Sequence, residues 1–239
     1  VIFVRFLLHM KSYKNVFFDL DETLWDFKTN SQETLSDVFE MYRLSERGVM
    51  EEEFYVRFQL HNNYYWDLFR KGTIAREELR IVRFSKTLLE FNVIDDVLTK
   101  NLSESYLHIL PTKTRLYDDA LEVLNYLKAK YSLHIITNGF EEVQFRKLHH
   151  SGITPYFKYV ITSEMAGSQK PNREIFKYAF NVTNASAMDS IFIGDSIEAD
   201  IHGAKSVGMD HVLFNPEKLS HNETVMHEVS ALRELKGLL

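Results

Sequence analysis

Residues 16–23 read Val-Phe-Phe-Asp-Leu-Asp-Glu-Thr, and this stretch decides the fold. Its first three residues are β-branched or aromatic and predict a short buried strand. Alternate residues of a strand share a face, so the carboxylates of Asp19 and Asp21 can point into one space. Two like charges this close are unfavourable unless a cation or a proton separates them. The pair therefore predicts a metal site, acid/base chemistry, or both, although aspartates after a strand also commonly cap turns and helices.

The rest of the chain predicts an α/β protein with an inserted helical domain. From residue 111 onward, short apolar strands alternate with helices, which is typical of a doubly wound parallel sheet covered on both faces. Between about residues 29 and 108 the spacing of apolar residues is helical. Because Asp19 already belongs to the first strand, this helical block is interpreted as an insertion. The predicted domains are an α/β core, residues 10–27 and 110–239, and a helical domain, residues 28–109.

Composition narrows the classes of partner. The 239 residues carry a net charge of -6 without a basic tract, which argues against a nucleic-acid polymer as partner. The absence of cysteine excludes disulfides and thiolate metal sites. Residues 1–9 are apolar but too short to span a bilayer, and we expect them to be an extension upstream of Met10, or alternatively an edge strand. No other stretch suits a membrane, so a cytoplasmic protein is expected.

Polar residues follow each predicted strand of the core. In open parallel sheets, ligands bind beyond the carboxyl ends of the strands, so these side chains are expected at one edge. Taken singly, each of these residues could simply be a turn residue, a surface lysine or a helix cap. Their expected meeting at one edge of the sheet favours a binding or catalytic site instead. They are Asp19, Asp21 and Thr23 after the first strand, Thr137 and Asn138 after the second, Lys170 after the third, and Asp195, Ser196 and Asp200 after the fourth.

The charges of this set indicate a divalent cation. Four carboxylates face one lysine, and such a pocket repels anions until a cation enters. Hard carboxylate and carbonyl oxygens suit Mg2+, which also binds phosphate oxygens. With the cation present, the pocket can bind a negatively charged phosphoryl group. Transfer of that group needs mainly the positioning of the reacting atoms and the neutralisation of the phosphoryl charge. A small phosphorylated metabolite is therefore the expected substrate.

Four motifs, in this order, resemble those of the haloacid dehalogenase superfamily of phosphohydrolases. The resemblance runs from about residue 15 to the end of the chain, and it implies that the helical block is the family's mobile cap. The motifs are Asp19-Leu20-Asp21-Glu22-Thr23, Ile136-Thr137-Asn138, Lys170-Pro171, and the run from Gly194 to Asp200.

The resemblance also implies a role for each residue. Asp19 is then the nucleophile, which forms an aspartyl-phosphate, and Asp21 is the general acid and base. Mg2+ is held by the Asp19 carboxylate, the backbone carbonyl of Asp21 and Asp195. The phosphoryl oxygens are bound by Thr137, Asn138 and Lys170, and the surrounding support comes from Asp200, Ser196 and Thr23.

For the substrate, residues 136–140 resemble the branch that contains pyrimidine 5′-nucleotidases. A second set of similar residues lies in the helical block. This favours a nucleoside 5′-monophosphate, with Trp25 as a candidate substrate contact. The second set is Asn62, Trp66, Phe69, Gly72, Ile74 and Leu79.

Three alternatives remain open. A sugar-phosphate phosphatase or phosphoglucomutase would share the fold and the motifs. A haloacid dehalogenase would also use an aspartate nucleophile, but it needs neither a metal nor an acid at Asp21. A phospho-accepting receiver module would share the acidic cluster but would be about half this length and would lack the helical insertion. The sequence leaves the oligomeric state open.

Overall fold

The structure, a computed structural model, describes residues 12–239, so the predicted extension at residues 1–9 lies outside the described residues. The chain divides into two compact units. The α/β unit contains the residues up to Leu24, residues 117–141 and residues 153–239, and the helical unit contains residues 25–116 and 142–152.

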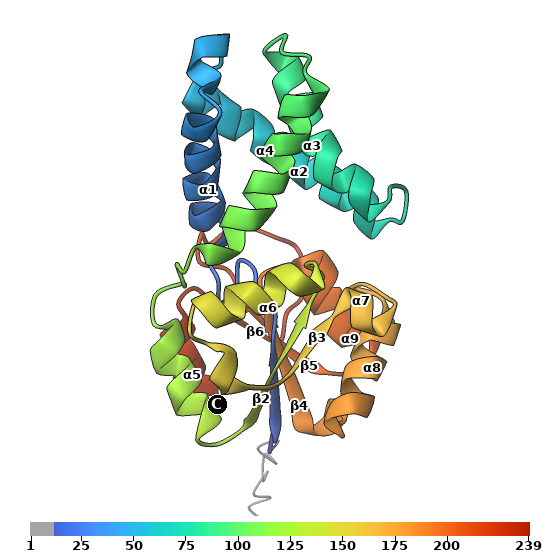
Figure 1. Cartoon of the computed structure of the whole chain (residues 1–239). Coiled ribbons are helices and arrows are strands. Elements are labelled where there is room, and N and C mark those ends of the chain that lie inside the picture. Colours follow the sequence, from blue (N-terminus) through green and yellow to red (C-terminus); the bar gives the residue numbers. More distant parts are fainter. Residues whose placement is uncertain (1–11) are drawn as a thin grey trace, which may run out of the picture. The chain divides into compact units, whose positions relative to one another are not determined.

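The α/β unit is built on a six-stranded parallel sheet (Figure 1). The strand order across the sheet is β3-β2-β1-β4-β5-β6, so β1 is central and pairs with β2 on one side and β4 on the other. The winding direction reverses at this position, where open sheets bind ligands. The predicted doubly wound parallel sheet is thus confirmed. The strands are β1 (Asn15–Phe18), β2 (Ser132–Thr137), β3 (Phe157–Thr162), β4 (Ser190–Gly194), β5 (Asp210–Phe214) and β6 (His227–Val229).

Helices cover both faces of the sheet. Helix α5 (Ala120–Lys128) lies on one face, and α8 (Arg173–Thr183) and α9 (His202–Ser206) lie on the other (Figure 1). Phe17 of β1 and Phe192 of β4 are fully buried in the core cluster that includes α8 and α9. Both faces of β1 are therefore enclosed, and the strand holds its carboxyl end in a fixed position. Two short helices complete this unit, α7 (Ser163–Ala166) and α10 (Leu235–Leu238).

The helical unit contains four helices from the predicted insertion. Helix α2 ends before Gly72 and α3 begins after it. This unit also includes α6 (Glu141–His150) from Glu142 onward, and Glu142 accepts a hydrogen bond from Arg80 at 2.6 Å. The four helices are α1 (Phe27–Met41), α2 (Glu51–Arg70), α3 (Arg76–Glu90) and α4 (Asp96–Ile109).

Two segments near the sheet edge depart from regular helices. Pro171 does not lie in the first turn of α8, because the Asn172 amide donates to the Gln169 carbonyl at 2.9 Å and closes a turn before the helix begins. The segment before α9 is a wide π-helical turn, Ile197–Ile201, in which the Ile201 amide donates to the Ser196 carbonyl at 3.1 Å. Such turns often occur at functional sites.

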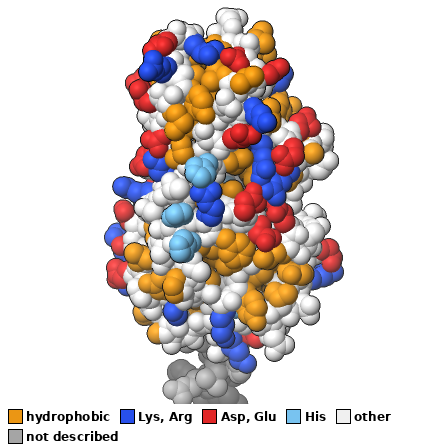
Figure 2. Space-filling view, viewed as in Figure 1, with side chains coloured by type: hydrophobic (Ala, Val, Ile, Leu, Met, Phe, Trp, Pro, Cys, Tyr) orange, Lys and Arg blue, Asp and Glu red, His pale blue; other side chains and the backbone are white. Residues whose placement is uncertain are grey.

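The surface gives little further indication of a partner. Figure 2 shows basic and acidic side chains intermixed over the face drawn, so that neither sign dominates it. Among the helices of the described part of the chain, none is both long and apolar enough to cross a membrane.

Candidate active site

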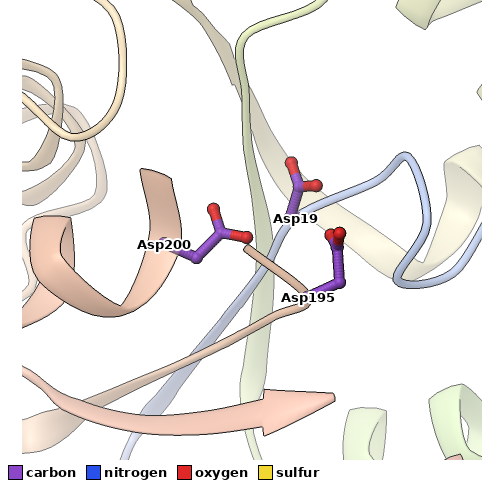
Figure 3. A group of neighbouring side chains, drawn as sticks. All are labelled: Asp19, Asp195 and Asp200. Atoms are coloured by element: carbon purple, nitrogen blue, oxygen red, sulfur yellow. The ribbon is translucent and has the colours of Figure 1, made fainter. Parts of the chain in front are cut away.

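Three aspartates from separate parts of the chain converge at the carboxyl end of β1 (Figure 3). Asp19 continues the sheet beyond β1, since its amide donates to the Ile193 carbonyl of β4 at 2.9 Å. Asp195 follows β4 directly, and Asp200 comes from the π-helical turn. One carboxylate oxygen of each lies within 4.8 Å of the others. The topology therefore brings together residues that are up to 181 positions apart in sequence.

Lys170 lies between two of these carboxylates. Its Nζ donates to Asp19 Oδ1 at 2.6 Å and lies 2.7 Å from Asp200 Oδ1. The side chain is only 2% exposed, so both ion pairs are shielded from solvent. Asn138 fixes the lysine backbone, because its side-chain amide donates to the Lys170 carbonyl at 2.9 Å and its oxygen accepts from the Lys170 amide at 2.8 Å. The ammonium group is thereby held at the nucleophile candidate.

The buried environment of the aspartate cluster disfavours ionisation of its carboxyl groups. Burial, with the neighbouring charges of Asp200 and Asp21, raises the pKa of Asp19 to about 7, although Lys170 opposes the shift. Burial and the charges of Asp200 and Asp19 also raise the pKa of Asp195. Burial pulls the pKa of Lys170 down, but Asp19 and Asp200 more than offset this and raise it. One lysine therefore does not neutralise the site.

Gly194 allows Asp200 to approach the end of β4. A Cβ atom built on Gly194 would lie 2.3 Å from Asp200 Oδ2, which is too close for any side chain. The same oxygen accepts a hydrogen bond from the Ser196 amide at 3.0 Å. A glycine at this position thus makes room for the carboxylate that pairs with Lys170.

The other predicted site residues lie around this cluster. Thr23 donates its hydroxyl to Asp195 Oδ1 at 3.2 Å, and the Ser196 hydroxyl accepts from the Ala199 amide at 3.1 Å. Thr137 is buried at the end of β2, where its hydroxyl accepts from the Gly139 amide at 3.2 Å. Thr23 and Ser196 therefore support the loop that carries Asp195 and Asp200, and Thr137 lies at the end of β2, next to β1 in the sheet.

Trp25 belongs to the helical unit and is fully buried. The Lys147 ammonium lies 4.3 Å from its ring centroid, within the range of a cation–π interaction. Because the Trp25 side chain is fully buried, a substrate contact there stays a prediction.

The donor set fits a hard divalent cation. Asp19, Asp195 and Asp200 offer carboxylate oxygens, and the pKa values of Asp19 and Asp195 are raised because their negative charges are not balanced. A divalent cation would relieve that repulsion, and oxygen ligands of this kind suit Mg2+. Asp200 contacts Lys170 through Oδ1 and the Ser196 amide through Oδ2, so both of its oxygens already have partners, and Asp19 and Asp195 are the better candidates to hold the ion.

Sequence reasoning missed two features of the site. It placed Asp200 among the supporting residues but did not foresee that this aspartate shares Lys170 with Asp19. It also gave no role to Tyr117, whose hydroxyl donates to Glu22 at 2.6 Å. Tyr117 stands in the connection that returns from the helical unit, where no motif signals it.

Comparison with known proteins identifies the family. The sequence model for haloacid dehalogenase-like hydrolases matches residues 16–214, which include every residue of the cluster. The chain belongs to this family. It is therefore a hydrolase, and the resemblance inferred from its motifs is confirmed.

Relatives within the haloacid dehalogenase-like family match nearly the whole chain. The HAD-hydrolase YfnB of Bacillus subtilis is 31% identical over 96% of this chain and 97% of its own length. The crystal structure of YfnB bound to magnesium has a TM-score of 0.87 and covers 95% of this chain and 99% of that chain, at 30% identity.

Two further relatives carry the names of specific phosphatases. The pyrimidine 5′-nucleotidase PynA of Streptococcus pneumoniae is 30% identical and covers 95% of both chains. The ribulose-1,5-bisphosphate 5-phosphatase of Halopiger xanaduensis is also 30% identical, over 94% of this chain and 98% of its own.

Proposed function

We propose that this hydrolase cleaves phosphoric monoesters, that it requires Mg2+, and that its substrates are pyrimidine nucleoside 5′-monophosphates. The observation that carries the proposal is the pairing of Lys170 with Asp19 and Asp200 beside Asp195. This arrangement combines a carboxylate nucleophile, a cation for phosphoryl oxygens, and acidic ligands for a metal. The similarity to the PynA nucleotidase supports the substrate class.

In this proposal each residue has a defined part. The Asp19 carboxylate attacks phosphorus and becomes transiently phosphorylated. Asp21 gives a proton to the departing ester oxygen and later takes one from the attacking water. Lys170 orients Asp19 and, with Thr137, donates hydrogen bonds to the phosphoryl oxygens. Asn138 supports this role through the Lys170 backbone.

Mg2+ would be held by Asp19, Asp195 and the backbone carbonyl of Asp21. When bound, the ion supplies positive charge that offsets both the carboxylates and the phosphoryl oxygens. The part proposed for residues 28–109 is that of the family's cap, which excludes water from the reaction and selects the substrate.

The test is hydrolysis of a panel of phosphorylated metabolites with Mg2+ or with EDTA. We expect release of phosphate from dUMP and dTMP, loss of activity in EDTA, and no activity in Asp19→Asn. Turnover of hexose phosphates without turnover of either nucleotide would overturn the nucleotide assignment. Full activity in EDTA would overturn the dependence on Mg2+.

A second candidate is a sugar-phosphate phosphatase. The observation that favours it is the 30% identity to the ribulose-1,5-bisphosphate 5-phosphatase, equal to that of PynA. The same panel separates the two candidates through the ratio of kcat/KM for nucleotides and for sugar phosphates.

A further inference from the structure

The turn that follows β1 contains a residue in an unfavourable backbone conformation. The Leu24 amide donates to the Leu20 carbonyl at 3.0 Å and closes this turn. Within it, Glu22 has a φ of 61°, in the left-handed region that residues with a Cβ rarely adopt. Such a residue persists only when its surroundings hold it, and these residues cluster at functional sites. The proposed reaction gives Glu22 no part.

Tyr117 holds this turn at two points within the α/β unit. Its hydroxyl donates to Glu22 Oε2 at 2.6 Å, and its amide donates to the Leu24 carbonyl at 3.0 Å. The Tyr117 ring is itself fixed, because it packs edge-on against Phe214 at the end of β5, with centroids 5.0 Å apart. The turn is thereby tied to the sheet through a residue far away in sequence.

The turn carries groups of the acidic site. Thr23, next to Glu22, donates to Asp195 at 3.2 Å. The backbone carbonyl of Asp21 immediately precedes Glu22, so the conformation of Glu22 sets the direction of that peptide group. Any rotation at Glu22 therefore displaces both the carbonyl and the threonine that contacts Asp195.

We propose that Tyr117 is a positioning residue for the divalent cation and that it acts through Glu22. The phenol hydrogen bond keeps Glu22 in its left-handed conformation, and this aims the Asp21 carbonyl and Thr23 at the acidic cluster. This inference takes one element from the proposed function, namely that the Asp21 carbonyl and Asp195 hold the ion.

The first test is Mg2+ binding to Tyr117→Phe, measured by titration calorimetry without substrate. We expect the dissociation constant for Mg2+ to rise by about tenfold, the size typical when support behind a metal ligand is lost. In kinetics, the half-saturating Mg2+ concentration should rise while KM at saturating Mg2+ stays unchanged. A dissociation constant equal to that of the unaltered protein would overturn the proposal.

A double-mutant cycle shows whether Tyr117 acts through Glu22. Glycine adopts a φ of 61° without strain, so Tyr117→Phe should have little further effect on Mg2+ binding in a Glu22→Gly background. An undiminished effect in that background would overturn the proposed route. If Tyr117→Phe folds poorly, Glu22→Gln and Glu22→Ala supply the same test. Both variants lack the charge of Glu22, but only the Gln side chain keeps an acceptor for the Tyr117 hydroxyl. The Glu22→Gln variant should therefore bind Mg2+ more tightly than Glu22→Ala, and equal affinity of the two variants would contradict the inference.

Tyr13→Phe is the matched control. Tyr13 also donates its hydroxyl to a carboxylate of the α/β unit, Asp210 Oδ2, at 2.7 Å. We expect this variant to lose thermal stability without a change in Mg2+ affinity. If Tyr13→Phe lost as much Mg2+ affinity as Tyr117→Phe, the effect of Tyr117→Phe would be explained by general destabilisation. The proposal that Tyr117 is a positioning residue would then be refuted. Mg2+ binding without phosphatase activity in the unaltered protein would overturn the proposed function and leave the Tyr117 inference standing.

Discussion

At the scale of single residues, the site depends on a shared lysine. Lys170 contacts Asp19 and Asp200 at nearly equal distances, 2.6 and 2.7 Å, and all three side chains are almost completely buried. The single positive charge of Lys170 cannot neutralise the negative charges of both carboxylates. The three side chains must therefore be considered together when substitutions are interpreted.

Asp19→Asn is expected to abolish turnover, because an amide cannot replace the proposed carboxylate nucleophile. The fold should persist at pH 8, since the raised pKa of Asp19 means that its charge is unfavourable in the folded protein. Phosphate release and a thermal melt measure the two effects. Retention of near-normal turnover would show that another residue is the nucleophile.

Asp21→Asn is expected to lower kcat by about 10²- to 10⁴-fold, the range typical for loss of a general acid and base. Mg2+ affinity should change little, because the backbone carbonyl remains in place. Steady-state kinetics and calorimetry separate these quantities. A selective loss of Mg2+ binding, with kcat preserved at saturating Mg2+, would assign the Asp21 carboxylate to the metal instead.

At the scale of elements, the end of β4 is shaped by a missing side chain. Gly194→Ala should destabilise the protein by about 1–3 kcal/mol, as expected when an atom is forced into a packed site. Because the added Cβ would displace Asp200, the ion pair with Lys170 should be disturbed and phosphatase activity should fall. Urea denaturation and kinetics provide the two measurements.

Gly237→Ala provides the control for this substitution. Gly237 lies in α10, and a Cβ there would meet no atom within 4 Å. The same chemical change should therefore leave stability equal or slightly higher, with activity unchanged. A comparable loss in both variants would mean that close packing at Gly194 is not the cause.

The helical unit contains a buried cation that also offers a prediction. Arg83 of α3 donates to Asn62 of α2 at 2.7 Å and to the Leu79 carbonyl at 3.0 Å. Its guanidinium carbon lies 5.7 Å from the ring centroids of Phe58 and Tyr106. Burial lowers the pKa of Arg83 to about 10, so the side chain remains charged at neutral pH. The Arg83–Asn62 hydrogen bond therefore joins α3 to α2 within an otherwise apolar interior.

Arg83→Met should lower the free energy of unfolding by about 1–3 kcal/mol, because it leaves the buried Asn62 oxygen without this donor. Arg83→Met combined with Asn62→Leu should recover much of the loss. Urea denaturation of the three proteins tests the pair. A double variant no more stable than Arg83→Met alone would show that the lost contacts with Leu79 and the rings dominate.

At the scale of the whole molecule, stability is expected to depend on pH through the acidic cluster. The pKa of Asp19 rises from its usual 3.8 to about 7, and that of Asp195 rises well above 3.8, so the folded protein binds protons more tightly than the unfolded chain. Without a metal, the contribution of these groups is most favourable below pH 4 and is lost as the pH rises through 7.

Mg2+ should therefore stabilise the protein more at pH 8 than at pH 5, because only the ionised carboxylates repel one another. The measurement is the shift in melting temperature on addition of Mg2+ at each pH, with Asp195→Asn as the control that reduces the difference. A shift that is the same at both pH values would mean that the cluster is not where the ion binds.

Much of the molecule could be predicted from the sequence, because strand ends in a parallel sheet meet at one edge. That rule predicts the positions of Asp19 and Asp195, which directly follow β1 and β4, whereas Lys170 lies beyond α7, eight residues after the end of β3. Contacts that depend on side-chain geometry between distant segments could not be predicted. Neither the hydrogen bond from Tyr117 to Glu22 nor the hold of Asn138 on the Lys170 backbone leaves a pattern in the residues.

The central place of β1 has a consequence for how the protein matures during synthesis. Asn15 pairs with Ser190, so β1 lacks its neighbour on one side until β4 has been synthesised. A nascent chain that ends before β4 has neither Asp195 nor Asp200 and holds only one side of the cluster. We therefore expect catalytic competence to arise only after Asp200 has been synthesised, and a product truncated before β4 to be inactive.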